Sequence, residues 1–268
     1  MSRIADRFVL TRREGRKGFI PFVTAGDPDL ETSLSIVHKL AELGADVIEL
    51  GVPFSDPMAD GPTIQRSSQR SLEKGTTLQS VIELAKEFRK KSNVALVLFS
   101  YFNPILHFGV ERFVDSAAQA GIDGVLFTDV IEDEAAELSA RLAEKDIDLI
   151  SLIAPTTSDE RLEKICANSR GFIYAVSRAG VTGAREAMSA DAERLVRRAR
   201  AFTDLPIAVG FGISNKDQIA DVWGYADAAV VGSAIVSEIE KTPQRTVAAV
   251  ESFVRELLPQ FANGSSEN

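Results

Sequence analysis

Two carboxylates that lie close together in the sequence could carry acid–base chemistry. Glu49 sits inside an otherwise apolar run, Asp46-Val47-Ile48-Glu49-Leu50-Gly51, and Asp60 follows in a loop stiffened by prolines. Burial of a carboxyl group disfavours its charged form and raises its pKa toward neutrality, which suits proton transfer. Two simpler alternatives stay open from the residues alone. Glu49 could pair with a lysine or arginine at a strand end, and Asp60, which precedes Gly61, could be a turn residue.

Three glycine-bearing segments in the second half of the chain could bind an anion. They span residues 179–183, 210–214 and 231–234. Glycine lets backbone N–H groups approach an anion closely, and the N-terminus of a following helix adds positive potential. Each segment alone could be an ordinary turn, but the last two together favour a phosphate site.

Short apolar segments separated by amphipathic stretches would position these groups. The apolar segments predict strands at residues 19–23, 47–50, 94–99, 124–127, 149–153, 172–176, 207–209 and 228–231. Stretches of helical period lie between them, among them residues 34–43, 78–88, 110–120, 133–143 and 192–201. Eight apolar strands alternating with helices favour an α/β protein, a closed (β/α)8 TIM barrel, over an open sheet. In such a barrel functional groups gather at the carboxyl ends of the strands, and a phosphate site after strands seven and eight recurs.

An extra helix is predicted before the first strand. The segment Arg3–Arg13 has the amphipathic pattern of a helix that caps the bottom of the barrel. Its apolar residues Ile4, Phe8 and Val9 are expected to turn inward. At the other end of the chain, the small polar residues 263–268 are expected to fray.

Composition excludes several classes of protein. The chain has 268 residues, of which 45% are hydrophobic, and a net charge of −9 at pH 7. Disorder is therefore excluded, and general binding to nucleic acid or to an anionic membrane is disfavoured. The one cysteine, Cys166, is expected to be a buried apolar residue, and the histidines His38 and His107 lack metal-ligand spacing, so no metal is expected. No linker divides residues 1–268, which predicts a single domain. With no apolar run of about 20 residues and no secretory signal at the N-terminus, a cytoplasmic protein is expected.

Several motifs carry a resemblance to a known family. The most specific one runs from Glu49 to Gln65 and reads ELGVPFSDPMADGPTIQ. The others are FIPFVTAGDP at residues 19–28, YFNP at 101–104, APTT at 154–157, SRAGVTG at 177–183 and GFGI at 210–213. On these motifs the chain resembles the tryptophan synthase alpha chain family over essentially its whole length.

The resemblance implies a reaction and two catalytic residues. The family is a carbon–carbon lyase of tryptophan biosynthesis that cleaves indole-3-glycerol phosphate into indole and glyceraldehyde 3-phosphate by a retro-aldol step. Glu49 matches the glutamate that moves protons, one to C3 of the indole ring and one from the glycerol hydroxyl. Asp60 matches the aspartate that accepts the indole N–H and stabilises positive charge on that ring.

The resemblance also implies how the substrate is held. Phe22, Tyr101 and Tyr174 fall where the family lines its indole pocket, although plain core packing stays open for Tyr101. Thr182 matches a residue of a mobile loop that contacts the Asp60 equivalent when the loop closes. The phosphate would be bound by the backbone, with the Ser233 hydroxyl assisting, at Gly183, Phe211, Gly212, Gly232 and Ser233.

A partner chain follows from the same resemblance. The family works in an α2β2 heterotetramer with a β chain, and pyridoxal phosphate belongs to that partner, so no cofactor is expected in this chain. Asp56 and Pro57 match the loop that faces the partner. After the fourth strand the family usually reads Pro-Asp-Leu-Pro, whereas this chain has Thr128-Asp129-Val130-Ile131. The missing prolines predict a less rigid loop and an altered affinity for the partner or altered activation by it.

Three other functions compete with this one. The chain could be a lyase that releases indole without a β chain, or a non-catalytic subunit that binds the phosphate ligand and regulates a partner. It could also be another phosphate-binding barrel of aromatic amino-acid synthesis, an isomerase or a synthase. The match over residues 54–65 disfavours this last class, and retention of both Glu49 and Asp60 disfavours the non-catalytic subunit.

Overall fold

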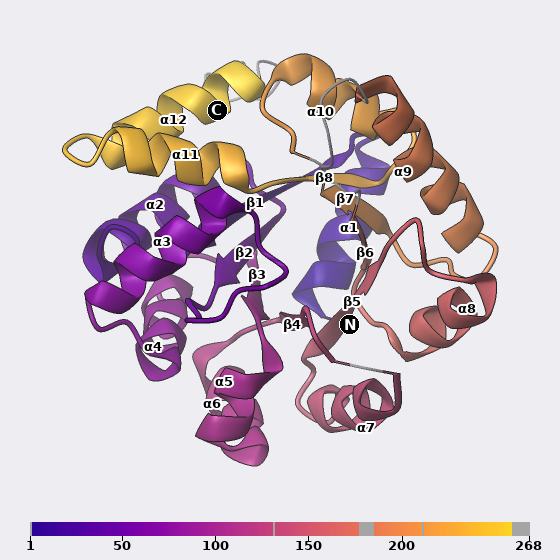
Figure 1. Cartoon of the computed structure of the whole chain (residues 1–268), viewed down its shortest axis with the longest axis horizontal. Coiled ribbons are helices and arrows are strands. Elements are labelled where there is room, and N and C mark those ends of the chain that lie inside the picture. The colour runs from indigo at the N-terminus through magenta and orange to yellow at the C-terminus, as the bar shows by residue number, and fades with distance from the viewer. Residues whose placement is uncertain (1, 131, 177–184, 211, 259–268) are drawn as a thin grey trace.

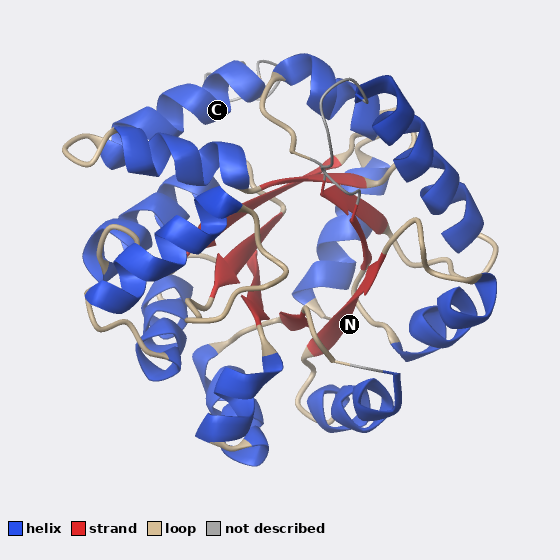
Figure 2. Ribbon diagram, in the orientation of Figure 1, coloured by secondary structure: helices blue, strands red, loops and turns tan. Residues whose placement is uncertain are grey.

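The computed structural model describes residues 2–130, 132–176, 185–210 and 212–258. Its strands form one closed barrel in sequence order, all parallel, in which β8 closes the ring on β1. Figure 2 shows the strands as an inner ring with the helices outside it. Figure 1 looks onto the carboxyl ends of the strands, with the N-terminal helix α1 (Arg3–Arg13) behind the barrel. The predicted (β/α)8 TIM barrel with an extra N-terminal helix is confirmed.

The predicted strands are all present, and their bounds differ from the prediction by at most one residue at either end. They are β1 (Gly18–Thr24), β2 (Val47–Gly51), β3 (Ala95–Ser100), β4 (Gly124–Phe127), β5 (Asp148–Ile153), β6 (Ile173–Val176), β7 (Ile207–Gly210) and β8 (Ala228–Val231). The helices that follow α1 are α2 (Leu30–Glu42), α3 (Pro62–Glu73), α4 (Leu78–Arg89), α5 (Phe102–Phe108), α6 (Val110–Ala120), α7 (Glu132–Ala143), α8 (Asp159–Asn168), α9 (Arg185–Ala199), α10 (Lys216–Trp223), α11 (Ser233–Lys241) and α12 (Thr246–Leu257). No helix within the described ranges is long and apolar enough to cross a membrane.

Local capping explains where the helices begin and end. Helix α2 begins four residues before the predicted start because the Asp29 side chain accepts a hydrogen bond from the backbone N–H of Thr32 and caps the first turn. Helix α6 spans the predicted residues 110–120 and ends at Gly121, whose φ of 74° is readily adopted by glycine. Helix α9 begins at Arg185 instead of residue 192 and therefore has nearly two more turns than predicted.

Alternate side chains of the strands fill the interior of the barrel. Buried residues from the strands form one interior cluster, which helix α1 joins through Ile4 and Phe8: Ile20, Val47, Ala95, Val97, Leu126, Ile150, Ala208, Ala228 and Val230, with Phe172 just before β6. Phe99, Leu152 and Tyr174 pack against this cluster and are only partly buried. They lie toward the carboxyl ends of their strands, so the interior is a packed core below and opens toward one face.

Three aspartates, two of them buried and one partly buried, fix the opposite, N-terminal end of the barrel. Asp46, Asp123 and Asp227 each stand one residue before a strand, and each carboxylate accepts the backbone N–H at the start of a neighbouring strand, from Phe19, Leu96 and Ile207 respectively. The three distances are all 2.8 Å. Each carboxylate thus ties the start of its own strand to the start of the preceding one. Sequence analysis did not single out these residues, although the signal, an aspartate just before an apolar strand, repeats along the chain.

Arginines of helix α1 bind two of these aspartates. Arg7 Nε lies 2.6 Å from Asp46 Oδ1, and Arg3 Nη1 lies 2.7 Å from Asp123 Oδ1. Both aspartates are almost fully buried, whereas the arginines reach solvent. The ion pairs therefore dock α1 onto the barrel where its apolar residues meet the interior cluster.

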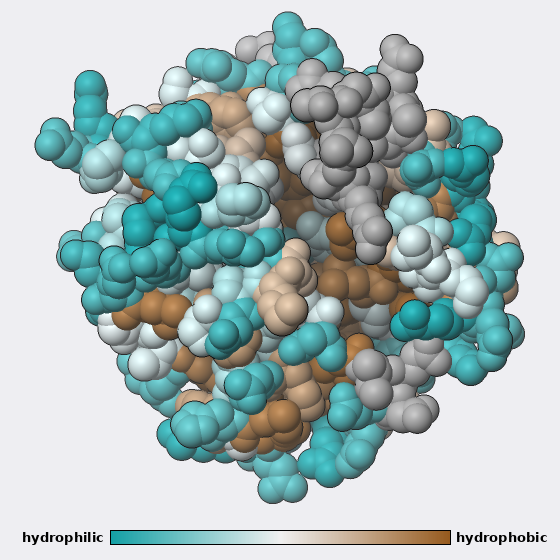
Figure 3. All heavy atoms as spheres, in the orientation of Figure 1, coloured by the Kyte–Doolittle hydropathy of each residue, from teal (hydrophilic) through white to brown (hydrophobic). Residues whose placement is uncertain are grey.

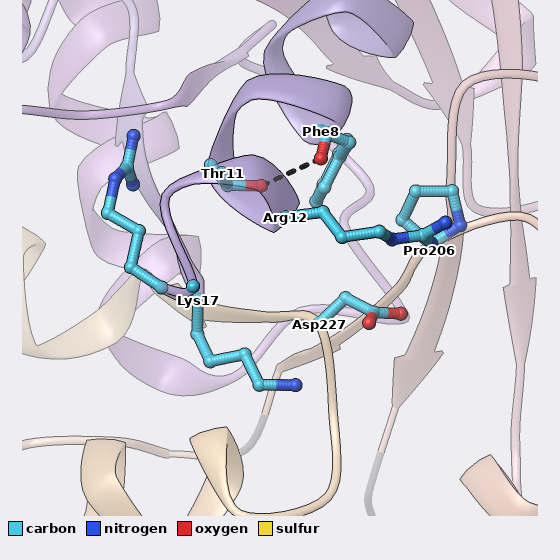
Figure 4. A pocket seen from close by; sticks show the side chains of 8 residues that line it. Phe8, Thr11, Arg12, Lys17, Pro206 and Asp227 are labelled. Carbon is cyan, nitrogen blue, oxygen red and sulfur yellow. Dashed lines mark hydrogen bonds between the residues drawn. The ribbon is translucent and has the colours of Figure 1, made fainter.

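The prediction that Val9 turns inward is wrong. Val9 is 39% exposed, whereas Ile4, Phe8 and Thr11 are buried. Residues 4, 8 and 11 share one helical face at spacings of four and three, and Val9 lies a further 100° around the helix. Figure 4 shows Thr11 donating its hydroxyl to the Phe8 carbonyl at 3.0 Å, beside a cavity of about 220 Å³ at this end of the barrel.

Removal of one of these carboxylates should destabilise the barrel without touching its other face. We expect Asp46→Ala to lower the free energy of unfolding by about 3 kcal/mol, because Arg7, Arg16 and the Phe19 N–H all lose their acceptor. Urea denaturation measures this, with the exposed Asp221→Ala as the control. An Asp46→Ala protein as stable as the control would show that these bonds do not hold the barrel together.

Candidate active site

Glu49 lies in the barrel interior near the open face. It is on β2, between Phe22 of β1 and Val97 of β3 in the sheet register. Its side chain is fully buried, and neither carboxylate oxygen has a hydrogen-bond partner among the described residues. Burial raises the pKa of Glu49 to about 8 because nothing compensates for the lost hydration of the anion. Glu49 is therefore a neutral acid at pH 7 and can donate a proton.

Asp60 lies in the loop between β2 and α3 and is half-buried. Burial raises its pKa to about 6, and a hydrogen bond from the Tyr101 hydroxyl opposes this rise. At pH 7 the side chain is therefore mostly ionised and can only accept hydrogen bonds. Two carboxyl groups whose pKa values differ in this way can serve as a proton donor and as an anionic stabiliser of positive charge.

Tyr101 anchors the loop that carries Asp60. Its hydroxyl accepts the backbone N–H of Ala59 at 2.8 Å, and its ring lies against that of Phe54, with the centroids 5.1 Å apart. Tyr101 as a whole is 6% exposed. Burial raises the pKa of Tyr101 to about 12, so the hydroxyl keeps its proton for the bond to Asp60. This anchoring role was not foreseen from the sequence, which suggested a pocket wall or core packing.

Phe22 and Tyr174 occupy space that two glycines leave free. A Cβ atom on Gly51 would lie 2.5 Å from Cζ of Phe22, and one on Gly210 would lie 2.2 Å from the hydroxyl oxygen of Tyr174. Each aromatic ring thus lies over the end of a strand whose last residue is a glycine. Burial raises the pKa of Tyr174 well above its ordinary value, and the charges of Glu49 and Asp60 add to the rise. Tyr174 therefore lies within electrostatic reach of both carboxylates as a neutral phenol.

The apolar part of the site includes residues that sequence analysis missed. The Phe99 ring meets the Phe22 ring edge-on, with the centroids 5.4 Å apart. Phe99 and Leu152 lie two residues beyond the interior positions Val97 and Ile150. Counting alternate residues along each strand would have found them. Figure 3 shows apolar surface in a hollow at the centre of this face, with hydrophilic side chains along part of its border.

Helix α11 offers backbone donors beside the aromatic wall. Gly232 precedes its first residue, Ser233, and no side chain caps the helix N-terminus, whereas Asn215 caps α10. A Cβ on Gly232 would lie 3.4 Å from Cβ of Phe22, so the two residues are in contact. Gly212 is exposed with a φ of 47°. These positions can present N–H groups to an anion. The other predicted contacts, Thr182, Gly183 and Phe211, lie outside the described residues.

The rim of this face carries the predicted partner loop. Asp56 is exposed and accepts the Ser55 hydroxyl at 2.6 Å, and Pro57 follows, half-buried. The next residue, Met58, is 93% exposed, and no pattern in the sequence singled it out. On the loop after β4, Asp129 Oδ1 accepts the backbone N–H of Phe102 at 2.8 Å and so caps helix α5.

Burial of Glu49 makes the stability of the protein depend on pH. The folded state keeps the proton up to a pKa of about 8, whereas an ordinary glutamate loses it near 4.5, so stability falls as the pH rises through this window. Glutamine cannot ionise. Relative to wild type, we expect Glu49→Gln to gain more than about 2 kcal/mol of stability between pH 5 and pH 8.

Urea denaturation at pH 5, 6, 7 and 8 measures the effect. The matched control is Glu256→Gln, because Glu256 is exposed on α12. A difference between Glu49→Gln and wild type that stays constant with pH would mean that Glu49 ionises as freely in the folded chain as in the unfolded one.

Comparison with known proteins shows the family of this chain. A family model described as tryptophan synthase alpha chain matches residues 8–263. Two tryptophan synthase alpha chains illustrate the similarity. The one from Solibacter usitatus is 47% identical over 263 residues, covering 97% of this chain and 98% of the relative. The one from Citrifermentans bemidjiense is 51% identical over 241 residues, covering 90% of each.

Solved structures agree with the sequence comparison. Tryptophan synthase subunit alpha from Legionella pneumophila superposes with a TM-score of 0.90 at 33% identity, covering 98% of this chain and 99% of that one. A chain of tryptophan synthase from M. tuberculosis, in its aminoacrylate-bound form, superposes with a TM-score of 0.87 at 33% identity, covering 96% and 98%. With both the sequence and the barrel matched over nearly their whole length, this chain belongs to the tryptophan synthase alpha chain family, the lyases that cleave indole-3-glycerol phosphate into indole and glyceraldehyde 3-phosphate.

Proposed function

We propose that Glu49 and Asp60 perform the family's cleavage reaction in this chain. The observation that carries the proposal is the buried, unpartnered Glu49 carboxyl group, whose pKa of about 8 keeps it protonated at neutral pH. An acid of this kind, enclosed by apolar side chains and next to an ionised aspartate, suits protonation of a carbon atom in a bound aromatic ring.

The proposed mechanism begins with protonation of the indole ring. Glu49 gives its proton to C3, which makes the ring an indoleninium cation, and Asp60 accepts the ring N–H and stabilises the positive charge. The Glu49 carboxylate then takes the proton of the glycerol hydroxyl. As the C–O bond becomes a carbonyl, the C–C bond breaks and its electron pair returns to the ring. The products are indole and glyceraldehyde 3-phosphate, and Glu49 is protonated again.

The walls of the site would hold the two ends of this substrate. Phe22, Tyr174 and Phe99 provide aromatic surface for the indole ring, and Tyr101 fixes the loop of Asp60. We assign the phosphate of this small phosphate ester to the backbone N–H groups of Gly212, Gly232 and Ser233, with the Ser233 hydroxyl assisting, and to Gly183 and Phe211. Thr182 is proposed to contact Asp60 when its loop closes.

A β chain is the expected partner, because the family's alpha chains act with one and carry no cofactor themselves, pyridoxal phosphate being held by the β chain. We propose an α2β2 complex in which Asp56 and Pro57 face the β chain, and the exposed Met58 supports this because it adds apolar surface to the same loop. We further propose a single domain over residues 1–268, a cytoplasmic location, as in the family's biosynthetic role, and no binding to nucleic acid or membrane.

Indole release by the Glu49→Gln variant tests the catalytic role. We expect turnover of indole-3-glycerol phosphate to fall by at least about 100-fold, because glutamine cannot donate or accept the protons. Binding of glyceraldehyde 3-phosphate, measured by calorimetry, should stay near the wild-type value, since the proposed phosphate contacts do not include β2 or the loop after it. The matched control, Glu256→Gln, should keep wild-type turnover. Near-normal indole release from Glu49→Gln would remove Glu49 from the reaction.

Titration with a β chain tests the partnership. We expect indole release by the alpha chain to rise and saturate as a purified family β chain is added, because docking at the rim would order the loop of Asp60. Asp56→Lys should weaken this activation and leave the activity of the isolated chain unchanged. Full activity without a β chain, with no further rise on addition, would identify the stand-alone lyase instead.

A further inference from the structure

The hydroxyl of Thr128 is a buried polar group that the mechanism does not use. Thr128 follows the last residue of β4, and its backbone N–H donates to the Ser100 carbonyl on the neighbouring strand at 3.2 Å. Its side-chain oxygen is buried and has no hydrogen-bond partner among the described residues. Buried hydroxyls are nearly always hydrogen-bonded, so an orphan beside a catalytic site points to a partner that the resting geometry does not fully engage.

The hydroxyl of the neighbouring Tyr101 can accept one more hydrogen bond. A phenolic hydroxyl has one proton to donate and can accept two hydrogen bonds. Tyr101 donates to Asp60 and accepts the Ala59 N–H, which leaves one acceptor position open. The Thr128 side chain, just after β4, interacts with this hydroxyl and lowers the pKa of Tyr101, which is the effect expected of a hydrogen-bond donor.

We propose that Thr128 is a positioning residue that donates its hydroxyl proton to Tyr101 and thereby holds the Tyr101–Asp60 hydrogen bond in place. The inference rests on the proposed role of Asp60 in the reaction. Thr128 touches neither the substrate nor the reacting atoms. Its hydroxyl acts through Tyr101, so that the end of β4 and the loop after β2 are joined at one phenolic oxygen.

The direction of the effect follows from hydrogen-bond cooperativity. A phenol that accepts a hydrogen bond becomes a stronger donor, so the Thr128 bond strengthens the bond from Tyr101 to Asp60. A stronger bond to the Asp60 carboxylate favours its ionised form. Among the described residues, Tyr174 is in electrostatic contact with Asp60 and keeps its proton, and it also contacts Glu49, which is neutral at pH 7. Loss of the Thr128 hydroxyl therefore shifts Asp60 toward the protonated form.

Two substitutions separate the hydroxyl from the shape of the side chain. Thr128→Val removes the hydroxyl and keeps the branched shape, whereas the matched variant Thr128→Ser keeps the hydroxyl. Each is combined with Tyr101→Phe. Carbon-detected NMR on the full chain, labelled at its aspartate carboxyl groups, follows the titration of Asp60, which the Asp60→Asn spectrum assigns. This readout needs no turnover.

We expect Thr128→Val to raise the pKa of Asp60 and Thr128→Ser to restore it. In the complex with a β chain, kcat/KM for indole release should fall about fivefold in Thr128→Val, the size expected for one hydrogen bond, and its acid limb should move to higher pH. With Tyr101→Phe already present, Thr128→Val should have no further effect on either quantity, because the two residues act through one oxygen.

Three results would overturn the inference. They are an unchanged titration of Asp60 in Thr128→Val, an equal shift in Thr128→Ser, or a Thr128→Val effect of the same size with and without the Tyr101 hydroxyl. Failure of the proposed function looks different. In that case wild type would release no indole, while the NMR titration of Asp60 would still decide whether Thr128 acts through Tyr101.

Discussion

The chemistry proposed for this barrel depends on one carboxyl group that has no hydrogen-bond partner among the described residues. Glu49 is enclosed on all sides, and its two oxygens have no hydrogen bond among the described residues. A buried charge is normally paired or neutralised, and here neutralisation prevails because no cation or donor in the described part of the chain reaches it. The packed layers below Glu49 supply the stability that offsets this cost. The pKa of Glu49 rises to about 8 because the carboxyl group is buried in an apolar barrel interior.

The carboxyl groups at the two ends of the barrel differ in their hydrogen-bond partners. At the N-terminal end Asp46 and Asp123 each accept an arginine and a strand N–H, so these acids are satisfied and serve the fold. At the other end Glu49 is unpaired and Asp60 has the Tyr101 hydroxyl, and their pKa values rise to about 8 and about 6. The carboxyl groups are buried at both ends of the barrel. The ends differ in how many hydrogen-bond donors reach those groups. On electrostatic grounds the contrast indicates a stabilising role for the carboxylates at the N-terminal face and supports the acid–base pair proposed at the other face.

The sequence predicted those features that depend on local pattern. Apolar periodicity located the strands, and the position of Glu49 within one such run indicated a buried carboxyl group with a raised pKa, which the structure confirms. Contacts between residues of different strands could not be predicted from the local sequence pattern. The bond from Ala59 to Tyr101 joins residues 42 positions apart, and Phe99 meets Phe22 only because β2, which lies between their strands, ends in Gly51 without a side chain. The prediction that Val9 turns inward was wrong for a different reason. Apolarity alone does not say which face of a helix is buried.

The loop after β4 shows how a departure from a family pattern can be accommodated. Where the resemblance predicts prolines, this chain has Thr128, and loss of proline was expected to loosen the loop. Asp129, which the family pattern shares, caps helix α5 through the Phe102 N–H. The hydroxyl of Thr128 is a group that proline lacks, and in our proposal its hydrogen bond to Tyr101 replaces the restraint of a rigid ring. Because the proposed bond ends on the phenol that donates to Asp60, it would connect the loop to the proposed chemistry in a way that a proline could not.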